Sequence, residues 1–211
     1  MTIKFEDPSA KSHWDSVYKR FPGNKVSWYQ KNPTISLNII EKISIAKNAP
    51  ILDAGCGTSS LVDQLLLRGY SNITLLDISS EALSLSRQRL GPESHRIKWH
   101  QGDVTLDSLP EDYILWHDRA VFHFLVNQAD RQSYVSNLKR SLKKDGHLVM
   151  ATFALSGPIQ CSGLKTVQYN SEKLGEELGP NFQLVETIDE CHAAPSGANQ
   201  LFSYFHFVKQ K

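Results

Sequence analysis

From residue 50 onward, short apolar runs alternate with segments in which apolar residues recur every three or four positions. The runs predict buried strands, and the helical spacing predicts amphipathic helices between them. Strands are expected at Ile51–Asp53, Ile73–Asp77, Arg96–His100, Tyr113–Trp116 and His147–Leu155. Helices are expected at Leu61–Arg68, from Ser79 to Gly91, and at Asp130–Lys144. This alternation predicts an α/β fold built on a parallel sheet.

The C-terminal part follows a different pattern. After a short helix at Glu172–Leu178, for which Ser171 is the expected N-cap, two strand-like runs occur at Phe182–Ile188 and Leu201–Val208. The link between them contains Pro195–Gly197 and is too short for a crossover helix. We therefore expect a doubly wound, Rossmann-like sheet of seven strands, mostly parallel, ending in an antiparallel hairpin.

The first fifty residues are helical and aromatic. Trp14, Val17, Tyr18 and Phe21 are spaced three or four apart, and a second helix follows Pro33. We expect a single domain over residues 1–211, with an N-terminal helical cap at 1–48 and the Rossmann-like core at 50–211. The aromatic residues Trp14, Tyr18, Trp28 and Tyr29 of this cap are candidates for a lid, although we favour ordinary helix packing as the explanation for Trp14 and Tyr18.

Composition narrows the possible partners. The 211 residues include 23 basic and 22 acidic side chains, for a net charge of +1, so we expect no binding to extended nucleic acid. The N-terminal residues contain no apolar stretch typical of a signal peptide or membrane anchor. Three scattered cysteines indicate neither a disulfide framework nor a zinc site. We expect a cytoplasmic protein without a bound metal, as a monomer or weak homodimer.

The stretch Asp53–Gly57, with the sequence DAGCG, places a glycine turn directly after the first strand. Gly55 and Gly57 allow the tight turn and the close approach of a ligand to the main chain. Asp77 ends the second strand, where an ionised carboxylate can accept hydrogen bonds from both hydroxyls of a ribose. These residues predict a site for a ligand that contains adenosine.

Asp103 supplies a third acid, after the third strand. With the glycine turn and the terminal hairpin, it makes the chain resemble the class I S-adenosylmethionine-dependent methyltransferases. The resemblance implies that Asp53 helps to position the amino acid part of the methyl donor, that Asp77 binds its ribose, and that Asp103 meets its adenine. S-adenosyl-L-methionine is then the cofactor and S-adenosyl-L-homocysteine the product. The expected donor-binding residues are Trp28, Asp53, Gly55, Gly57, Asp77, Ile78, Asp103 and Val104.

A competing interpretation is a short-chain dehydrogenase, because Tyr169 and Lys173 form a YxxxK match and Ser156 lies upstream. That chemistry needs the tyrosine and the lysine on one helix, whereas the expected cap at Ser171 leaves Tyr169 outside it. Position 60 is also a serine where a dinucleotide-binding turn favours glycine. We therefore favour the methyltransferase.

The acceptor is expected beyond the fourth strand, where the sequence Trp116–Phe124 concentrates polar and aromatic residues. His117 and His123 are candidate proton acceptors, Asp118 is a candidate for orienting them, and Arg119 is a candidate for holding a substrate anion. A structural alternative is that Asp118 and Arg119 lock a loop.

The C-terminal third is loosely similar to tellurite-resistance and thiopurine-type methyltransferases, which implies a small acceptor such as a thiol or chalcogen compound. Ala193 replaces an arginine that tellurite-resistance enzymes tend to carry, and Cys161 and Cys191 are candidate metalloid ligands or ordinary semi-buried thiols. Two alternatives stay open at this stage. One is a protein lysine methyltransferase, and the other is a protein that binds S-adenosylmethionine without catalysis.

Overall fold

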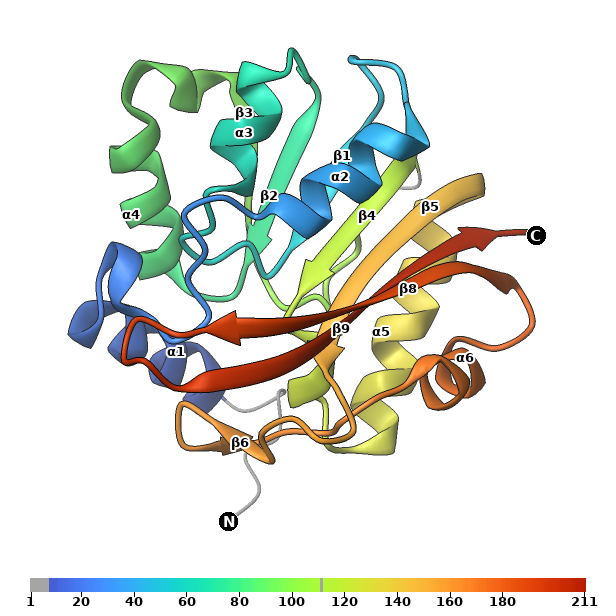
Figure 1. Ribbon diagram of the computed structural model, residues 1–211. Coiled ribbons are helices and arrows are strands. Elements are labelled where there is room, and N and C mark those ends of the chain that lie inside the picture. Colours follow the sequence, from blue (N-terminus) through green and yellow to red (C-terminus); the bar gives the residue numbers. More distant parts are fainter. Residues whose placement is uncertain (1–7, 111) are drawn as a thin grey trace.

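A computed structural model describes residues 8–110 and 112–211, and its centre is a seven-stranded sheet (Figure 1). The strand order is β3-β2-β1-β4-β5-β9-β8. Neighbouring strands from β3 to β5 pair in parallel, and β9 is antiparallel to both β5 and β8. The strands are β1 (Ile51–Ala54), β2 (Ile73–Asp77), β3 (Ile97–Gln101), β4 (Tyr113–Arg119), β5 (Leu142–Phe153), β8 (Phe182–Ala193) and β9 (Asn199–Lys209). The predicted mostly parallel sheet with its terminal hairpin is confirmed.

Alternation along the buried strands divides the core between the two faces of the sheet. Adjacent residues Ile51 and Leu52 of β1 belong to different hydrophobic clusters. The Ile51 cluster also takes side chains from α2 (Thr34–Ile43), α3 (Leu61–Leu67) and α4 (Ser80–Leu90). The Leu52 cluster takes them from α5 (Gln128–Ser141) and α6 (Ser171–Leu178). Helices therefore cover both faces, as expected for a doubly wound fold.

Several expected helix boundaries differ from the observed ones, and two of the differences have a clear structural cause. The N-cap of α6 is Asn170 and not Ser171, because the Asn170 side chain accepts a 2.9 Å hydrogen bond from the backbone N–H of Lys173. Helix α5 ends at Ser141 and not at Lys144, because Leu142 adopts an extended backbone and pairs with Tyr113 of β4. Pairing of Leu142 with β4 therefore ends the helix three residues earlier than its pattern predicts.

The segment before β1 divides into two parts. Helix α2 contacts β5 and β9 and packs on a face of the sheet, whereas α1 (Pro8–Arg20) packs against α4. A 3-10 turn, η1 (Gly23–Lys25), follows α1. Among the described residues, no helix is long and apolar enough to cross a membrane.

A small hairpin follows β5 and lies near the N-terminal segment. It consists of β6 (Gln160–Cys161) and β7 (Leu164–Lys165), and Cys161 Sγ lies 3.9 Å from the Ser27 hydroxyl. Figure 1 shows α1 and β6 on the same side of the molecule, beyond the carboxyl end of β4. The N-terminal segment and this hairpin thus meet over the end of the sheet where parallel α/β folds bind ligands.

Candidate functional site

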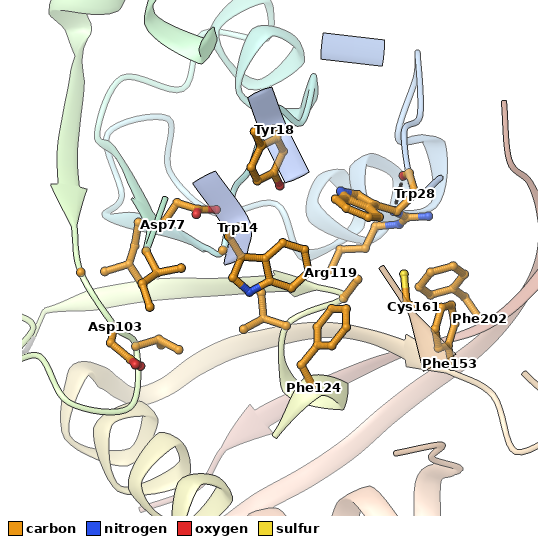
Figure 2. Close-up of a pocket in the computed structure, with 17 residues that line it drawn as sticks. Trp14, Tyr18, Trp28, Asp77, Asp103, Arg119, Phe124, Phe153, Cys161 and Phe202 are labelled. Carbon is orange, nitrogen blue, oxygen red and sulfur yellow. Dashed lines mark hydrogen bonds between the residues drawn. The ribbon is translucent and has the colours of Figure 1, made fainter. Parts of the chain in front are cut away.

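A cavity of about 690 Å³, open to solvent, lies at the carboxyl ends of β1, β2 and β4. Figure 2 shows Asp77 and Asp103 at one end, Trp14 in the middle, and Arg119, Cys161, Phe153 and Phe202 at the other end. The lining also includes the expected donor residues Trp28, Gly55, Ile78 and Val104. The long, two-ended shape suits a donor and an acceptor placed side by side.

Asp77 lies at the polar end and is buried. Its Oδ2 accepts a 2.7 Å hydrogen bond from the Gly57 N–H, and its Oδ1 accepts one of 2.8 Å from the Ser79 N–H. These bonds tie the carboxylate to the glycine turn and to the start of α4, and each oxygen retains a lone pair for a ribose hydroxyl. Burial raises the pKa of Asp77 to about 6, against the lowering effect of the two backbone hydrogen bonds.

Asp103 offers an unused acceptor in the same region. Its Oδ1 accepts from both the backbone N–H and the hydroxyl of Thr105, at 2.8 and 2.7 Å. Its Oδ2 is buried and has no hydrogen-bond partner in the described structure. Burial is the main reason why the pKa of Asp103 is raised. A buried, unpartnered carboxylate oxygen is costly unless a ligand completes it, and the amino group of adenine is a suitable donor.

Both glycines of the turn are required by their surroundings. Gly55 has a φ of +64°, and a Cβ there would lie 2.0 Å from Cγ2 of Val121. Gly57 has a φ of +51°, and a Cβ there would lie 2.3 Å from the Tyr18 hydroxyl. Larger residues are thus excluded both by backbone conformation and by space.

Aromatic rings from the N-terminal segment cover the middle of the cavity. The Trp14 ring packs edge-on against Trp28 and Phe124, with centroid distances of 5.9 and 5.0 Å, and Tyr18 packs edge-on against Trp28 at 6.2 Å. Trp14, Tyr18 and Trp28 line this cavity, and Tyr29 lines the adjoining one. The residues expected as a lid therefore lie over the site, and they also belong to the core.

A second cavity of about 440 Å³ adjoins the first, and the two share Trp28, Gly55 and Arg119. Its lining includes Asp53 and His117. His117 Nδ1 lies 2.7 Å from Oδ1 of Asp53, while Oδ2 of Asp53 is buried and has no partner among the described residues. This second cavity extends the donor site toward a buried negative charge.

Arg119 joins four parts of the chain at the aromatic end. Its Nε donates to the Tyr204 hydroxyl and its Nη1 to the Trp28 carbonyl, both at 2.7 Å. Its Nη2 lies 3.6 Å from Oε2 of Glu190, and the guanidinium carbon lies 4.5 Å from the centre of the Phe202 ring. Nη2 makes no hydrogen bond within the described structure. The buried Nη2 amino group of Arg119 can therefore still donate a hydrogen bond to a ligand.

Asp118 and His123 have internal partners and line neither cavity. Asp118 accepts from the N–H groups of Val121 and Phe122 and from the Tyr134 hydroxyl, and burial raises its pKa to about 6. This carboxylate holds the turn after β4.

His123 is fully buried, and its ring stacks on Phe153 with a centroid distance of 4.4 Å. Its Nδ1 accepts a 3.1 Å hydrogen bond from the Phe153 N–H, and burial lowers its pKa to about 3. The geometry supports a structural position for Asp118 and His123 and offers no support for a role as proton acceptor.

Several residues of the site were missed by the sequence analysis. Phe153 and Phe202 form walls of the larger cavity, and Gln30 and Glu190 complete the Arg119 network. Phe153 and Phe202 lie in strands that the hydrophobic pattern identifies, but the pattern does not show which strand ends face a ligand.

The dehydrogenase interpretation also fails on geometry. Tyr169 precedes α6 and is fully buried in the hydrophobic core, and Lys173 lies against its ring, 4.8 Å from the centroid. Neither residue lines the two cavities. This pair therefore has no contact with the nucleotide-type site.

Comparison with known proteins agrees with this geometry. A family model described as a methyltransferase domain matches residues 51–146. The EEF1A lysine methyltransferase 2 of Homo sapiens is 26% identical over 199 residues, covering 86% of this chain and 78% of that protein. A malonyl-[acyl-carrier protein] O-methyltransferase of Bacillus cereus is 32% identical over 145 residues, which cover 65% of this chain and 52% of that protein.

Solved structures show the same fold. An S-adenosylmethionine-dependent methyltransferase from Anabaena variabilis superposes with a TM-score of 0.74 at 13% identity, over 100% of this chain and 99% of that one. The solved structure shows that the fold is shared, and the methyltransferase-domain match, the glycine turn and the three acids near the strand ends support the assignment of this chain to the class I S-adenosylmethionine-dependent methyltransferases. It is an enzyme whose methyl donor is S-adenosylmethionine.

Proposed function

We propose that this methyltransferase methylates a small, acidic and soft nucleophile, a thiol or chalcogen compound, at the aromatic end of the larger cavity. One observation carries the proposal. The described lining of that cavity contains the cation of Arg119 and no histidine, and its two carboxylates, Asp77 and Asp103, lie at the opposite end.

This lining favours an acceptor that ionises by itself. Amines and hydroxyl groups need a base to remove a proton. A thiol has a pKa of roughly 8.5, and it loses its proton readily near a positive charge. Tyr18 is not a substitute base, because burial raises the pKa of its hydroxyl well above the usual value. The free N–H of Arg119 is placed to stabilise a thiolate or a comparable anion.

The donor supplies a methyl group already activated on a sulfonium. The work of this chain is then to hold both reactants in line and to exclude water. Asp77 and Asp103 hold the adenosine, and the rings of Trp14 and Trp28 cover the centre of the cavity, where an aromatic face attracts a positively charged sulfonium. Aromatic walls also suit a polarisable sulfur acceptor.

A second candidate is methylation of a protein lysine. The human relative that matches 86% of this chain is a lysine methyltransferase by name, and an aromatic channel can accommodate a lysine side chain. The cation of Arg119 argues against it, because an incoming ammonium would meet a like charge at the aromatic end. Glu190 reduces this repulsion, being 3.6 Å from the guanidinium.

The test is a methyl-transfer screen with isotopically labelled donor. Thiols, selenite, tellurite, amines, phenols and a cell lysate are each incubated with the enzyme, and small-molecule and protein products are separated. We expect label in a thiol or chalcogen product. Label confined to protein, or to amines, contradicts the proposal. The Asp77→Ala variant serves as the control for transfer that does not depend on the donor site.

A further inference from the structure

Three buried side chains from three different elements form a continuous hydrogen-bonded chain beneath the smaller cavity. The hydroxyl of Ser36 in α2 lies 2.9 Å from Nε2 of His117 in β4, and Nδ1 of the same ring lies 2.7 Å from Oδ1 of Asp53 in β1. Ser36 is fully buried, and Asp53 and His117 are exposed by 2% and 3%. Parallel pairing explains the second contact, because Asp53 and His117 are register partners in β1 and β4.

The chemistry of the three groups determines which group donates and which accepts in each of these hydrogen bonds. A carboxylate only accepts hydrogen bonds, so the hydrogen on Nδ1 of His117 points to Asp53. A neutral ring then accepts at Nε2, and the Ser36 hydroxyl is the donor there. Both ring nitrogens are occupied by protein partners, so neither is free to contact an acceptor.

The series of hydrogen bonds from Ser36 through His117 ends at the second carboxylate oxygen of Asp53, Oδ2. Oδ2 is buried and has no partner among the described residues, and Asp53 lines the smaller cavity. An unpartnered buried carboxylate oxygen is unfavourable unless a hydrogen-bond donor reaches it, and a positively charged donor makes the strongest bond to a carboxylate. S-adenosylmethionine carries such a group, the α-ammonium of its amino acid part. The two cavities meet at Gly55, Trp28 and Arg119, so the amino acid part of a donor whose ribose lies at Asp77 can extend toward Asp53.

We propose that His117, oriented by Ser36, is a positioning residue that holds the Asp53 carboxylate so that Oδ2 receives the ammonium group of the methyl donor. This role concerns the donor and applies whichever acceptor is methylated. It rests on the expected role of Asp53 and replaces the expectation that His117 removes a proton from the acceptor. The consequence is selectivity for ligands that carry the amino acid part.

Two ligands isolate this selectivity. S-adenosylhomocysteine has the ammonium group, whereas 5′-methylthioadenosine has the same adenosine and sulfur but lacks the amino acid part. Calorimetry gives the dissociation constant of each ligand and thus their ratio for every variant. We expect His117→Leu to weaken binding of S-adenosylhomocysteine by roughly 10-fold or more, with less than about a 2-fold change for methylthioadenosine. Ser36→Ala should give a smaller loss in the same direction.

Further variants separate positioning from general damage. The side-chain amide of His117→Asn can still donate to Asp53, so it should restore much of the selectivity lost in His117→Leu. His95→Gln changes an exposed histidine and should leave both constants unchanged. A parallel loss for both ligands in His117→Leu and Ser36→Ala would overturn the proposal, because disruption of the fold does not discriminate between them.

The role of Asp53 is tested separately from the role of His117. If Asp53→Asn retains the selectivity, then Asp53 does not bind the ammonium group and the proposal fails at that step. If Asp53→Asn loses selectivity while His117→Leu keeps it, Asp53 binds the donor without needing His117. Neither outcome affects the acceptor proposal, which is tested by the labelled products.

Discussion

Asp15 in α1 and Ser79 at the start of α4 are joined by a 2.7 Å hydrogen bond from the serine hydroxyl to Oδ1 of the aspartate. The same oxygen accepts from the backbone N–H of Glu81 at 3.1 Å, so Asp15 caps α4 from another helix. Burial opposes ionisation of Asp15, but its hydrogen bonds with Lys11, Ser79 and Glu81 outweigh it, and the pKa is lowered. This contact holds α1, which carries Trp14 and Tyr18, against the start of α4, close to Asp77.

We expect Asp15→Ala to loosen this contact. The loss of a helix-capping carboxylate should lower the free energy of unfolding by about 0.5–2 kcal/mol and speed the release of S-adenosylhomocysteine. Urea unfolding and stopped-flow displacement measure the two effects. Asp15→Asn retains an accepting oxygen, so its stability and its release rate should lie between those of Asp15→Ala and the wild type. An unchanged release rate in Asp15→Ala would show that α1 does not retain the donor.

Replacing Asp77 should weaken donor binding directly. Asp77→Ala removes the carboxylate expected to accept hydrogen bonds from the ribose, and we expect a loss of about 1–3 kcal/mol in binding free energy. Calorimetry with S-adenosylhomocysteine and with methylthioadenosine should show similar losses, because both contain the ribose. Unchanged affinity would refute this role of Asp77.

Donor affinity should also depend on pH through Asp77. Its pKa of about 6 in the free protein means that the carboxylate is ionised above this pH and protonated below it. Ribose hydroxyls bind the ionised form better, so affinity should be full above pH 7 and fall as the pH decreases through 6. Calorimetry between pH 5 and pH 8 checks this, with Asp77→Ala as the control. A wild-type affinity that does not vary over this range contradicts the assignment.

The glycine turn should tolerate no side chain at position 55. Gly55→Ala places Cβ against Val121 and forces alanine into a left-handed conformation that costs roughly 1–2 kcal/mol. We expect strongly reduced donor binding and lower stability. Adding Val121→Ala should relieve the clash but not the backbone strain, giving partial recovery in a thermal unfolding and binding assay. Full recovery in the double variant would mean that the conformation of Gly55 is unimportant.

Arg119 should matter more for the acceptor than for the donor. Arg119→Gln removes the cation of the aromatic end, and we expect a fall in kcat/KM for the acceptor of roughly 10-fold or more, with a much smaller change in donor affinity. Tyr204→Phe is the matched control, since it removes the hydroxyl that Nε contacts while keeping the charge. If Arg119→Gln mainly weakens donor binding, the guanidinium serves the donor instead.

The fold and the placement of the expected donor residues at one edge of the sheet were predictable because they depend on local patterns. Asp77 and Asp103 follow strands, and strand ends in a parallel sheet meet at one edge whatever the rest of the chain does. The roles of His117 and His123 were not predictable. The sequence places them six residues apart beyond one strand, but β1 and α2 enclose the first, and Phe153 encloses the second.

By itself, the sequence determined the class of protein and the parallel sheet with its terminal hairpin, and it predicted that three acids near the strand ends bind the donor. Hydrophobic period and glycine turns act over a few residues, so they can be recognised without knowing which elements touch. Tertiary structure alone decided which groups are free to act. Arg119 Nη2 makes no hydrogen bond within the described structure, because Nε and Nη1 are the groups that donate to Tyr204 and Trp28 and Glu190 stays 3.6 Å away from Nη2. Both ring nitrogens of His117 are occupied by Asp53 and Ser36. Such contacts join residues between 64 and 91 positions apart, a separation at which sequence spacing carries no information about distance.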